Sequence, residues 1–180
     1  MSAATNKTIL LLGGARSGKS ARAQELAGLA GGRVLFCATA GPLDDEMRSR
    51  IEKHRRSRPP GWDTLEAGRD IGRSLGRQAS QYDAIIIDCI TILVANVMGH
   101  GSEAEEAESA VNAEILCLIE LLKRRQSNYI LVSNEAGSGL VPDNRLGRLY
   151  RDELGKANQK LAAVSDEVYL LTAGIPLKLK

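Results

Sequence analysis

The residues best suited to chemistry are the last eight of the segment ILLLGGARSGKS at positions 9–20. They fit the pattern G-x-x-x-x-G-K-[ST], in which a glycine-rich turn between a strand and a helix holds phosphate groups. Gly13 and Gly18 allow the backbone to turn so that successive N–H groups point at phosphate oxygens. Lys19 supplies a positive charge for the outer phosphates, and the Ser20 hydroxyl is placed to ligate Mg²⁺. The pattern therefore predicts a site for a nucleoside triphosphate.

The flanks of this turn distinguish it from a glycine-rich turn that matches the pattern by chance. The apolar run at 9–12 predicts a buried strand, and ARAQELAGLA at 21–30 has strong helix propensity. Strand, turn and helix in that order are the context that the motif requires. The residues that the motif predicts to bind nucleotide are Gly13, Gly14, Ala15, Arg16, Ser17, Gly18, Lys19 and Ser20.

A second candidate for nucleotide chemistry is Asp88, which ends the apolar stretch AIIID. A carboxylate is expensive to bury at the end of an apolar strand unless it has a partner. In enzymes with a phosphate-binding loop, such an aspartate helps the serine or threonine of the loop to hold Mg²⁺. The competing interpretation is an ordinary N-cap, by Asp88 or Thr91, for a helix that begins near Ile90. Because the loop is present, we favour Ser20 and Asp88 as the metal ligands.

The segment RSRIEKHRRSR at 48–58 contains six lysines or arginines together with His54. Three interpretations compete: a solvated helix face, a nucleic-acid patch, and an anion site built around His54. The second lacks the aromatic residues that commonly accompany single-strand binding. In the third, the cationic neighbours disfavour imidazolium, so a neutral ring can attack phosphorus while arginines neutralise the displaced phosphate. The residues alone leave all three open.

The composition is that of one globular domain. A chain of 180 residues with 43% hydrophobic content can bury a sizeable core, and we predict a single nucleotide-binding domain over 1–180. The net charge of +2 is too small to indicate nucleic-acid binding by itself. The three cysteines have no metal-like spacing, and Cys37 and Cys89 are expected to be reduced and buried. We find no signal peptide and no apolar run long enough to span a membrane, so a cytoplasmic protein is expected.

Strand-like and helix-like segments alternate along the chain and must position these residues. We expect strands at 9–12, 33–38, 84–88, 129–133 and 167–172, and a short edge strand at 177–180. Besides the helix that follows the glycine-rich turn, we expect helices at 44–55, 70–80, 90–98, 103–125 and 144–164. This order predicts an α/β fold with a mostly parallel sheet and helices on both of its faces.

Motifs from nearly the whole chain resemble those of one family. They are GGARSGKS at 13–20, DDEMRSRIEKHRRSRPPGW at 44–62, IIIDCIT at 85–91, VSNEAGSGLVP at 132–142 and the segment at 150–180. Many families share the phosphate-binding loop, but the loop followed by D-E-M…R-I…H-R…R-P…W…E and S-N-E…G…G…V-P is far more selective. With these motifs the chain resembles the bifunctional adenosylcobinamide kinase/adenosylcobinamide-phosphate guanylyltransferase family.

The resemblance implies a P-loop fold similar to the core of recombinase-type ATPases, and assembly as a homotrimer. It also implies two activities. The aminopropanol hydroxyl of adenosylcobinamide is phosphorylated by a nucleoside triphosphate. GMP is then transferred from GTP to that phosphate through a GMP-histidine intermediate, giving adenosylcobinamide-GDP and pyrophosphate. The expected partners are therefore a corrinoid, GTP or ATP, and Mg²⁺, without nucleic acid.

The resemblance also places the functional residues. The histidine nucleophile falls on His54, and the nucleotide positions outside the loop fall on Ala38, Thr39, Ala40, Arg55, Arg56, Ser57, Arg58, Glu66 and Asp88. Glu66 suits guanine because a carboxylate can accept both N1–H and N2–H, although without the family it would be an ordinary surface acid. Asn134 and Glu135 follow a predicted strand, where ligands gather in open α/β sheets, and contact with the corrinoid or the metal is expected there.

Two other functions fit parts of the sequence. A small-molecule kinase without guanylyltransferase activity would need the loop and Asp88, but not His54 with its arginines. A nucleic-acid-stimulated ATPase of the same fold class would use the segment at 48–58 to contact the phosphate backbone. That protein would bind nucleic acid with a strong salt dependence and would form no covalent adduct with a nucleotide.

Overall fold

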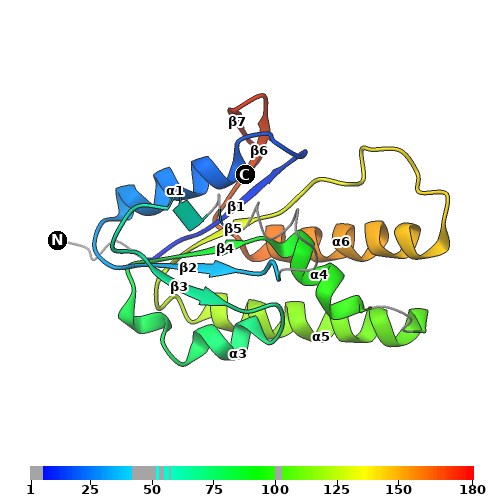
Figure 1. Ribbon diagram of the computed structural model, residues 1–180, viewed down its shortest axis with the longest axis horizontal. Coiled ribbons are helices and arrows are strands. Elements are labelled where there is room, and N and C mark those ends of the chain that lie inside the picture. Colours follow the sequence, from blue (N-terminus) through cyan, green and yellow to red (C-terminus); the bar gives the residue numbers. More distant parts are fainter. Residues whose placement is uncertain (1–5, 42–51, 53–54, 57, 100–102) are drawn as a thin grey trace.

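The computed structural model describes residues 6–41, 52, 55–56, 58–99 and 103–180, and within them one seven-stranded sheet (Figure 1). The strand order is β3-β2-β4-β5-β1-β6-β7. Every neighbouring pair is parallel except β6 and β7, which are antiparallel. The strands are β1 (Thr8–Gly13), β2 (Val34–Ala38), β3 (Asp63–Glu66), β4 (Ala84–Asp88), β5 (Asn128–Val132), β6 (Glu167–Thr172) and β7 (Ile175–Lys178).

Helices cover both faces of this sheet, as the alternation of strands and helices predicts. In Figure 1, α1 lies on one side of the sheet, whereas α3, α5 and α6 lie on the other. The described helices are α1 (Lys19–Ala30), α3 (Ile71–Gly76), α4 (Ile90–Met98), α5 (Ala104–Lys123) and α6 (Arg145–Val164), with a short 3₁₀ helix at Ala79–Gln81. None of these helices is long and apolar enough to cross a membrane.

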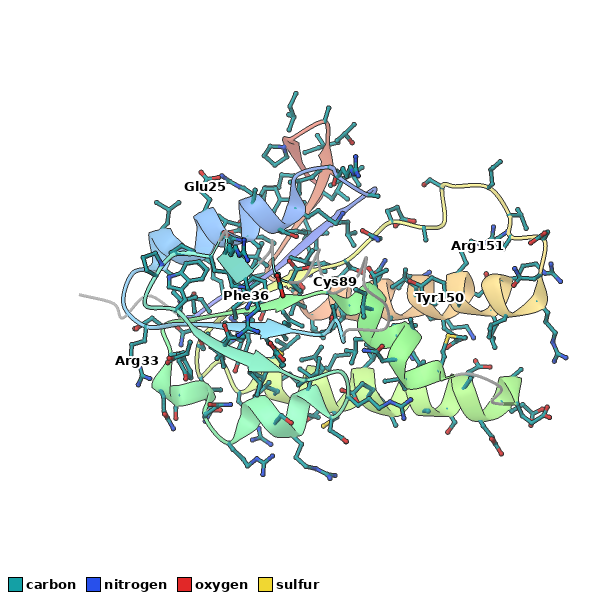
Figure 2. The ribbon with its side chains drawn as sticks, viewed as in Figure 1. Glu25, Arg33, Phe36, Cys89, Tyr150 and Arg151 are labelled. Carbon is teal, nitrogen blue, oxygen red and sulfur yellow. The ribbon has the colours of Figure 1, made fainter. Side chains whose placement is uncertain are left out.

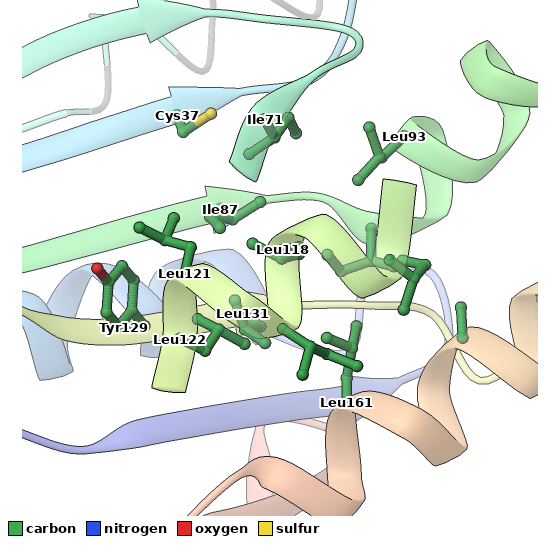
Figure 3. Close-up of a cluster of buried hydrophobic side chains, with 14 of the residues drawn as sticks. Cys37, Ile71, Ile87, Leu93, Leu118, Leu121, Leu122, Tyr129, Leu131 and Leu161 are labelled. Carbon is green, nitrogen blue, oxygen red and sulfur yellow. The ribbon is translucent and has the colours of Figure 1, made fainter. Parts of the chain in front are cut away.

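The core consists of two apolar clusters separated by the sheet. In β4, Ile85 and Ile87 join the larger cluster with α3, α4, α5 and α6, whereas Ile86 joins the smaller cluster beneath α1. Figure 3 shows part of the larger cluster, with Ile87 beside Leu118 and Leu121 of α5. Because both faces of a central parallel strand are buried, β4 is a continuous apolar run rather than an alternating one. Packing on both faces therefore holds the carboxyl ends of the strands at a rigid edge.

Some expected elements have other bounds in the structure. The helix expected at 70–80 ends at Gly76 and is followed by the 3₁₀ turn, since glycine is a poor helix former. The last strand begins at Ile175, two residues before the expected start. Strand β3 has no counterpart in the sequence prediction, because its short sequence DTLE is largely exposed. Most of the helix expected at 44–55, and most of the loop at 99–101, lie outside the described residues.

Candidate nucleotide-binding site

The predicted phosphate-binding loop connects the end of β1 to the start of α1. The backbone leaves the strand at Gly13 with φ of 149° and enters the helix after Gly18, whose φ is 96°. A Cβ atom on Gly13 would lie 2.4 Å from the carbonyl oxygen of Leu171 and 2.7 Å from Oγ of Ser17. Only glycine therefore fits at Gly13, where positive φ and a close approach to β6 coincide. The loop has the strand-turn-helix context that its sequence predicts.

The Lys19 side chain is folded into the loop. Its Nζ donates hydrogen bonds to the carbonyl oxygens of Gly13 at 2.9 Å and Gly14 at 2.6 Å, and to Oγ of Ser17 at 3.4 Å. Burial lowers the pKa of Lys19 from its ordinary value, while the nearby Cys89 and Asp88 act in the opposite direction. A partly desolvated ammonium at this position interacts strongly with an anion, because less water screens the charges.

A cavity of about 270 Å³ lies beside the loop at the carboxyl edge of the sheet. Phe36 of β2 and Cys89, the residue between β4 and α4, both line it and are labelled in Figure 2. Eight of the residues predicted to bind nucleotide line this cavity: Ala15, Arg16, Lys19, Ser20, Ala38, Ala40, Arg58 and Asp88. The remaining lining residues are Phe36, Cys89, Ile92, Val132 and Asn134. The structure thus brings residues from distant parts of the chain to one hollow next to the phosphate-binding loop.

Strand register explains why these residues meet. Near the carboxyl ends of five adjacent strands, one residue from each strand is the register partner of the next. From β3 across to β1, these residues are Glu66, Ala38, Asp88, Val132 and Leu11. Ligands of open α/β sheets bind outside the carboxyl ends of the strands. The row therefore places the end of β4 and the start of the loop on the same side of the molecule.

Ser20 and Asp88 line the same cavity, from α1 and from the end of β4. Their hydroxyl and carboxylate oxygens are the hard donors that Mg²⁺ prefers, and Mg²⁺ bound to a nucleotide takes its other ligands from phosphates and water. Among the residues that the structure describes, no group of three or more His, Cys, Asp or Glu could hold a metal ion. Two such oxygen donors fit a Mg²⁺ ion that would share its coordination with nucleotide phosphates.

The N-cap interpretation of Asp88 is wrong. The residue at the N-cap of α4 is Cys89, whose own side chain makes no capping hydrogen bond. The hydroxyl of Thr91, the other candidate cap, instead accepts a hydrogen bond from the Asn134 N–H at 2.8 Å. Asp88 is half-buried at the cavity, next to the loop.

The three residues at 38–40 have two different roles. Ala38 and Ala40 line the cavity, whereas Thr39 is completely buried and its hydroxyl contacts protein. The Thr39 hydroxyl accepts a hydrogen bond from the Cys89 N–H at 2.7 Å and donates one to the Cys89 carbonyl at 2.8 Å. Asn96 of α4 donates to the Thr39 carbonyl at 2.9 Å. Thr39 therefore connects the end of β2 to the residue that follows Asp88.

Among the described residues of the basic segment at 48–58, Arg58 is the one that lines the cavity. Its guanidinium carbon lies 3.9 Å from the centroid of the Phe36 ring, and its Nη1 donates to Oγ1 of Thr64 at 3.1 Å. Burial and the nearby Arg55 lower the pKa of Arg58, while Asp88 and Glu66 raise it. The stacked guanidinium is a positive charge held in place beside the cavity.

The other residues expected from the basic segment lie differently. Arg55 pairs with Glu66, at 3.5 Å between Nη1 and Oε1, and both side chains are exposed. The Arg56 side chain is 84% exposed, pairs with Glu52 and does not line the cavity. His54 and Ser57 lie outside the described residues. The structure thus places Arg55 beside Glu66, at one end of the row of strand ends, and Arg56 beside Glu52.

Sequence reasoning missed four lining residues: Phe36, Cys89, Ile92 and Val132. Each lies within four residues of a predicted strand end, and the apolar side chains that mark these residues also mark core positions, so the sequence could not tell the two apart. Burial raises the pKa of the Cys89 thiol, so Cys89 is a wall of the cavity rather than a reactive thiolate.

Three proteins of similar sequence match this chain over nearly their full length. The bifunctional adenosylcobalamin biosynthesis protein CobU of Salmonella typhimurium is 43% identical over 180 aligned residues, covering 96% of this chain and 99% of that protein. The protein of the same name from Escherichia coli is 41% identical, with the same coverage. Protein CobP of Pseudomonas aeruginosa is 38% identical over 171 residues, covering 95% of this chain and 96% of that one.

Two solved structures have a similar fold at low sequence identity. The flagellar accessory protein FlaH from Methanocaldococcus jannaschii has a TM-score of 0.52 and 16% identity, covering 97% of this chain and 78% of FlaH. The RadB recombinase has a TM-score of 0.53 and 16% identity, covering 91% of this chain and 73% of RadB. These likenesses support the predicted similarity to the recombinase core as a statement about fold.

The family described as cobinamide kinase / cobinamide phosphate guanyltransferase matches residues 9–179. The match spans the loop, the row of strand ends and strands β6 and β7, and the three relatives cover 95–96% of this chain. The chain belongs to the cobinamide kinase / cobinamide phosphate guanyltransferase family.

Proposed function

We propose that this protein phosphorylates adenosylcobinamide with a nucleoside triphosphate and then transfers GMP from GTP to the product. One observation carries the proposal: a single cavity is lined by Lys19 and Ser20 of the loop, by Asp88, and by Arg58 of the basic segment. The family to which the chain belongs indicates the substrates, because its description names these two activities. The cavity and the basic segment supply the groups that such chemistry needs.

In the kinase step, the substrate hydroxyl oxygen attacks the γ-phosphorus. The bond from that phosphorus to the β,γ-bridging oxygen breaks, the nucleoside diphosphate leaves, and the hydroxyl proton is released. The loop N–H groups and Lys19 hold the triphosphate in line for this attack. Ser20 and Asp88 would hold Mg²⁺, which neutralises charge on the phosphates when bound.

In the guanylyl step, we propose that a ring nitrogen of His54 attacks the α-phosphorus of GTP. A phosphorus–nitrogen bond forms and pyrophosphate leaves. A phosphate oxygen of adenosylcobinamide phosphate then attacks the same phosphorus and displaces the histidine. Arg58 stabilises the charge that develops on the phosphates, since it belongs to the same segment as His54 and lines the cavity.

Recognition of guanine is assigned to Glu66, whose carboxylate can accept N1–H and N2–H. Glu66 ends β3 and is the register partner of Ala38, which lines the cavity. A purine held there would extend from the phosphates along the row of strand ends. The trimer and the cytoplasmic location expected from the sequence remain predictions.

The test uses GTP labelled on the α-phosphate. The wild-type protein with Mg²⁺ should acquire acid-labile, base-stable label, as expected of a phosphohistidine. His54→Ala should lose this label and the transfer of GMP, yet still phosphorylate adenosylcobinamide, because phosphoryl transfer to a hydroxyl needs no protein nucleophile. A label that persisted in His54→Ala would reject His54 as the nucleophile.

A second variant tests whether both steps use one loop. Lys19→Ala should lose both activities, since the same loop must hold the triphosphate whichever phosphorus is attacked. Guanylylation at the wild-type rate in Lys19→Ala would require a separate nucleotide site. A wild-type protein that phosphorylates adenosylcobinamide but takes up no label would be a kinase alone, which is the alternative function.

A further inference from the structure

We propose that the side-chain amide of Asn134 contacts the terminal phosphate of the bound triphosphate and stabilises it during phosphoryl transfer. This inference rests on the proposed function and deepens it, because it assigns a catalytic residue to the kinase step. Asn134 lines the cavity together with Lys19, Ser20 and Asp88.

The position of Asn134 follows from the strand order. Strand β5 lies between β1, which leads into the loop, and β4, which ends at Asp88. After β5 the main chain continues to form hydrogen bonds with β1. Ser133 N–H donates to the Leu11 carbonyl at 2.9 Å, and Glu135 N–H donates to the Gly13 carbonyl at 3.1 Å. Asn134 is therefore held between the first residue of the loop and the predicted metal ligand.

The main chain of Asn134 is fixed by two side chains. Its N–H donates to the Thr91 hydroxyl at 2.8 Å, and its carbonyl accepts from Nδ2 of Asn158 at 3.0 Å. Asn158 is itself held by the Ser133 hydroxyl, which donates to its Oδ1 at 2.7 Å, and both residues are buried. With the N–H and C=O engaged inside the protein, the carboxamide is the polar group that Asn134 presents to a ligand.

The structure separates Asn134 from Glu135, which the sequence presents as a pair. Oε1 of Glu135 accepts a hydrogen bond from the Gly137 N–H at 2.9 Å, within the loop that follows. Glu135 does not line the cavity, whereas Asn134 does. A neutral amide beside the phosphates is also the better chemistry, since a carboxylate there would repel the triphosphate.

We expect the carboxamide of Asn134 to donate a hydrogen bond to the terminal phosphate of the triphosphate. The loop N–H groups hold the inner phosphates and Lys19 reaches the outer ones, where Ser20 and Asp88 would hold a Mg²⁺ ion that neutralises phosphate charge. A group between the loop and Asp88 is therefore on the side of the outer phosphates. An N–H donor aimed at the transferring group is worth about 10²–10³ in kcat when removed. In guanylyl transfer the reaction occurs at the α-phosphorus, so the same donor is remote from the chemistry.

The experiment compares Asn134→Ala and Asn134→Asp with Asn128→Ala, a control at the first residue of β5, the strand that Asn134 follows. Asn134→Ala should lower kcat for phosphorylation of adenosylcobinamide about 100-fold, and GMP transfer less than about 10-fold. Asn134→Asp should lose more phosphorylation than Asn134→Ala, because its charge faces the phosphates. Asn128→Ala should keep both rates, since Asn128 contacts Lys7 and Asp83 far from the cavity.

A binding measurement needs no corrinoid and decides the contact by itself. In Asn134→Ala, affinity for a non-hydrolysable ATP analogue should fall relative to affinity for ADP, because only the analogue carries the terminal phosphate. An unchanged ratio of the two affinities would overturn the inference, as would equal loss of both activities. If the wild-type protein failed to phosphorylate adenosylcobinamide, the proposed function would fall, and the ratio would still decide whether Asn134 contacts the terminal phosphate. Should Asn134→Ala fail to fold, Asn134→Ser allows the same comparison.

Discussion

Replacement of Thr39 by valine removes one hydroxyl from a completely buried position and leaves a side chain of nearly the same shape. In the native protein this hydroxyl accepts from the Cys89 N–H at 2.7 Å and donates to the Cys89 carbonyl at 2.8 Å. The two bonds join the end of β2 to the start of α4. Their loss should therefore destabilise the fold and loosen the edge where Asp88 lies.

The magnitude follows from what each partner keeps. The Cys89 carbonyl also accepts from the Leu93 N–H at 3.1 Å, so it remains bonded in the valine variant. The Cys89 N–H has no such second partner among the described hydrogen bonds. A stranded buried donor costs about 1–3 kcal/mol and an ordinary lost hydrogen bond about 1 kcal/mol, which gives about 2–4 kcal/mol for Thr39→Val. Thr39→Ser keeps the hydroxyl and loses one methyl group, at about 1 kcal/mol.

The assay is urea denaturation of the wild-type protein, Thr39→Val and Thr39→Ser. We expect the free energy of unfolding to fall in the order wild type, serine variant, valine variant. The Mg²⁺ concentration that gives half-maximal phosphorylation should rise in the valine variant and stay near the wild-type value in the serine variant, because Cys89 follows Asp88 directly. A valine variant as stable as the serine variant would refute the assignment of these hydrogen bonds.

Two further predictions concern the metal and the packing of the helices. Asp88→Asn should reduce Mg²⁺-dependent turnover by orders of magnitude while nucleotide still binds, which steady-state kinetics across Mg²⁺ concentrations and a nucleotide titration measure; unchanged Mg²⁺ dependence would remove Asp88 from the metal site. Gly72→Ala should destabilise the protein by about 1–3 kcal/mol through overpacking, because its Cβ would lie 2.6 Å from the Cys117 carbonyl oxygen of α5. Gly28→Ala, in α1 with no atom within 4 Å of the added Cβ, is the matched control and should stabilise by about 0.5–1 kcal/mol. Equal effects of the two alanine substitutions on the urea midpoint would contradict the close approach of α3 to α5.

The predictability of the fold differed between central and edge elements. The central strands β1, β4 and β5 were placed within a residue or two, because burial on both faces makes each a continuous apolar run. The sequence does not predict strand β3, because its side chains are largely exposed and give no apolar signal. Its strand conformation comes from pairing with β2. The sequence predicts one helix at 70–80 where the structure has α3 and a 3₁₀ turn, because one weakly amphipathic pattern covers both.

The sequence by itself determined the phosphate-binding loop, because its requirements are local: glycines at the turn, a lysine at the helix start, and a strand and a helix on either side. It also indicated Asp88, as a carboxylate at the end of an apolar strand. Only the tertiary structure decided that Thr39 bonds to Cys89, that Arg58 stacks on Phe36, and that Asn134 rather than Glu135 lines the cavity. These contacts join segments far apart in the chain. They depend on the order and register of the strands, which no short stretch of sequence encodes.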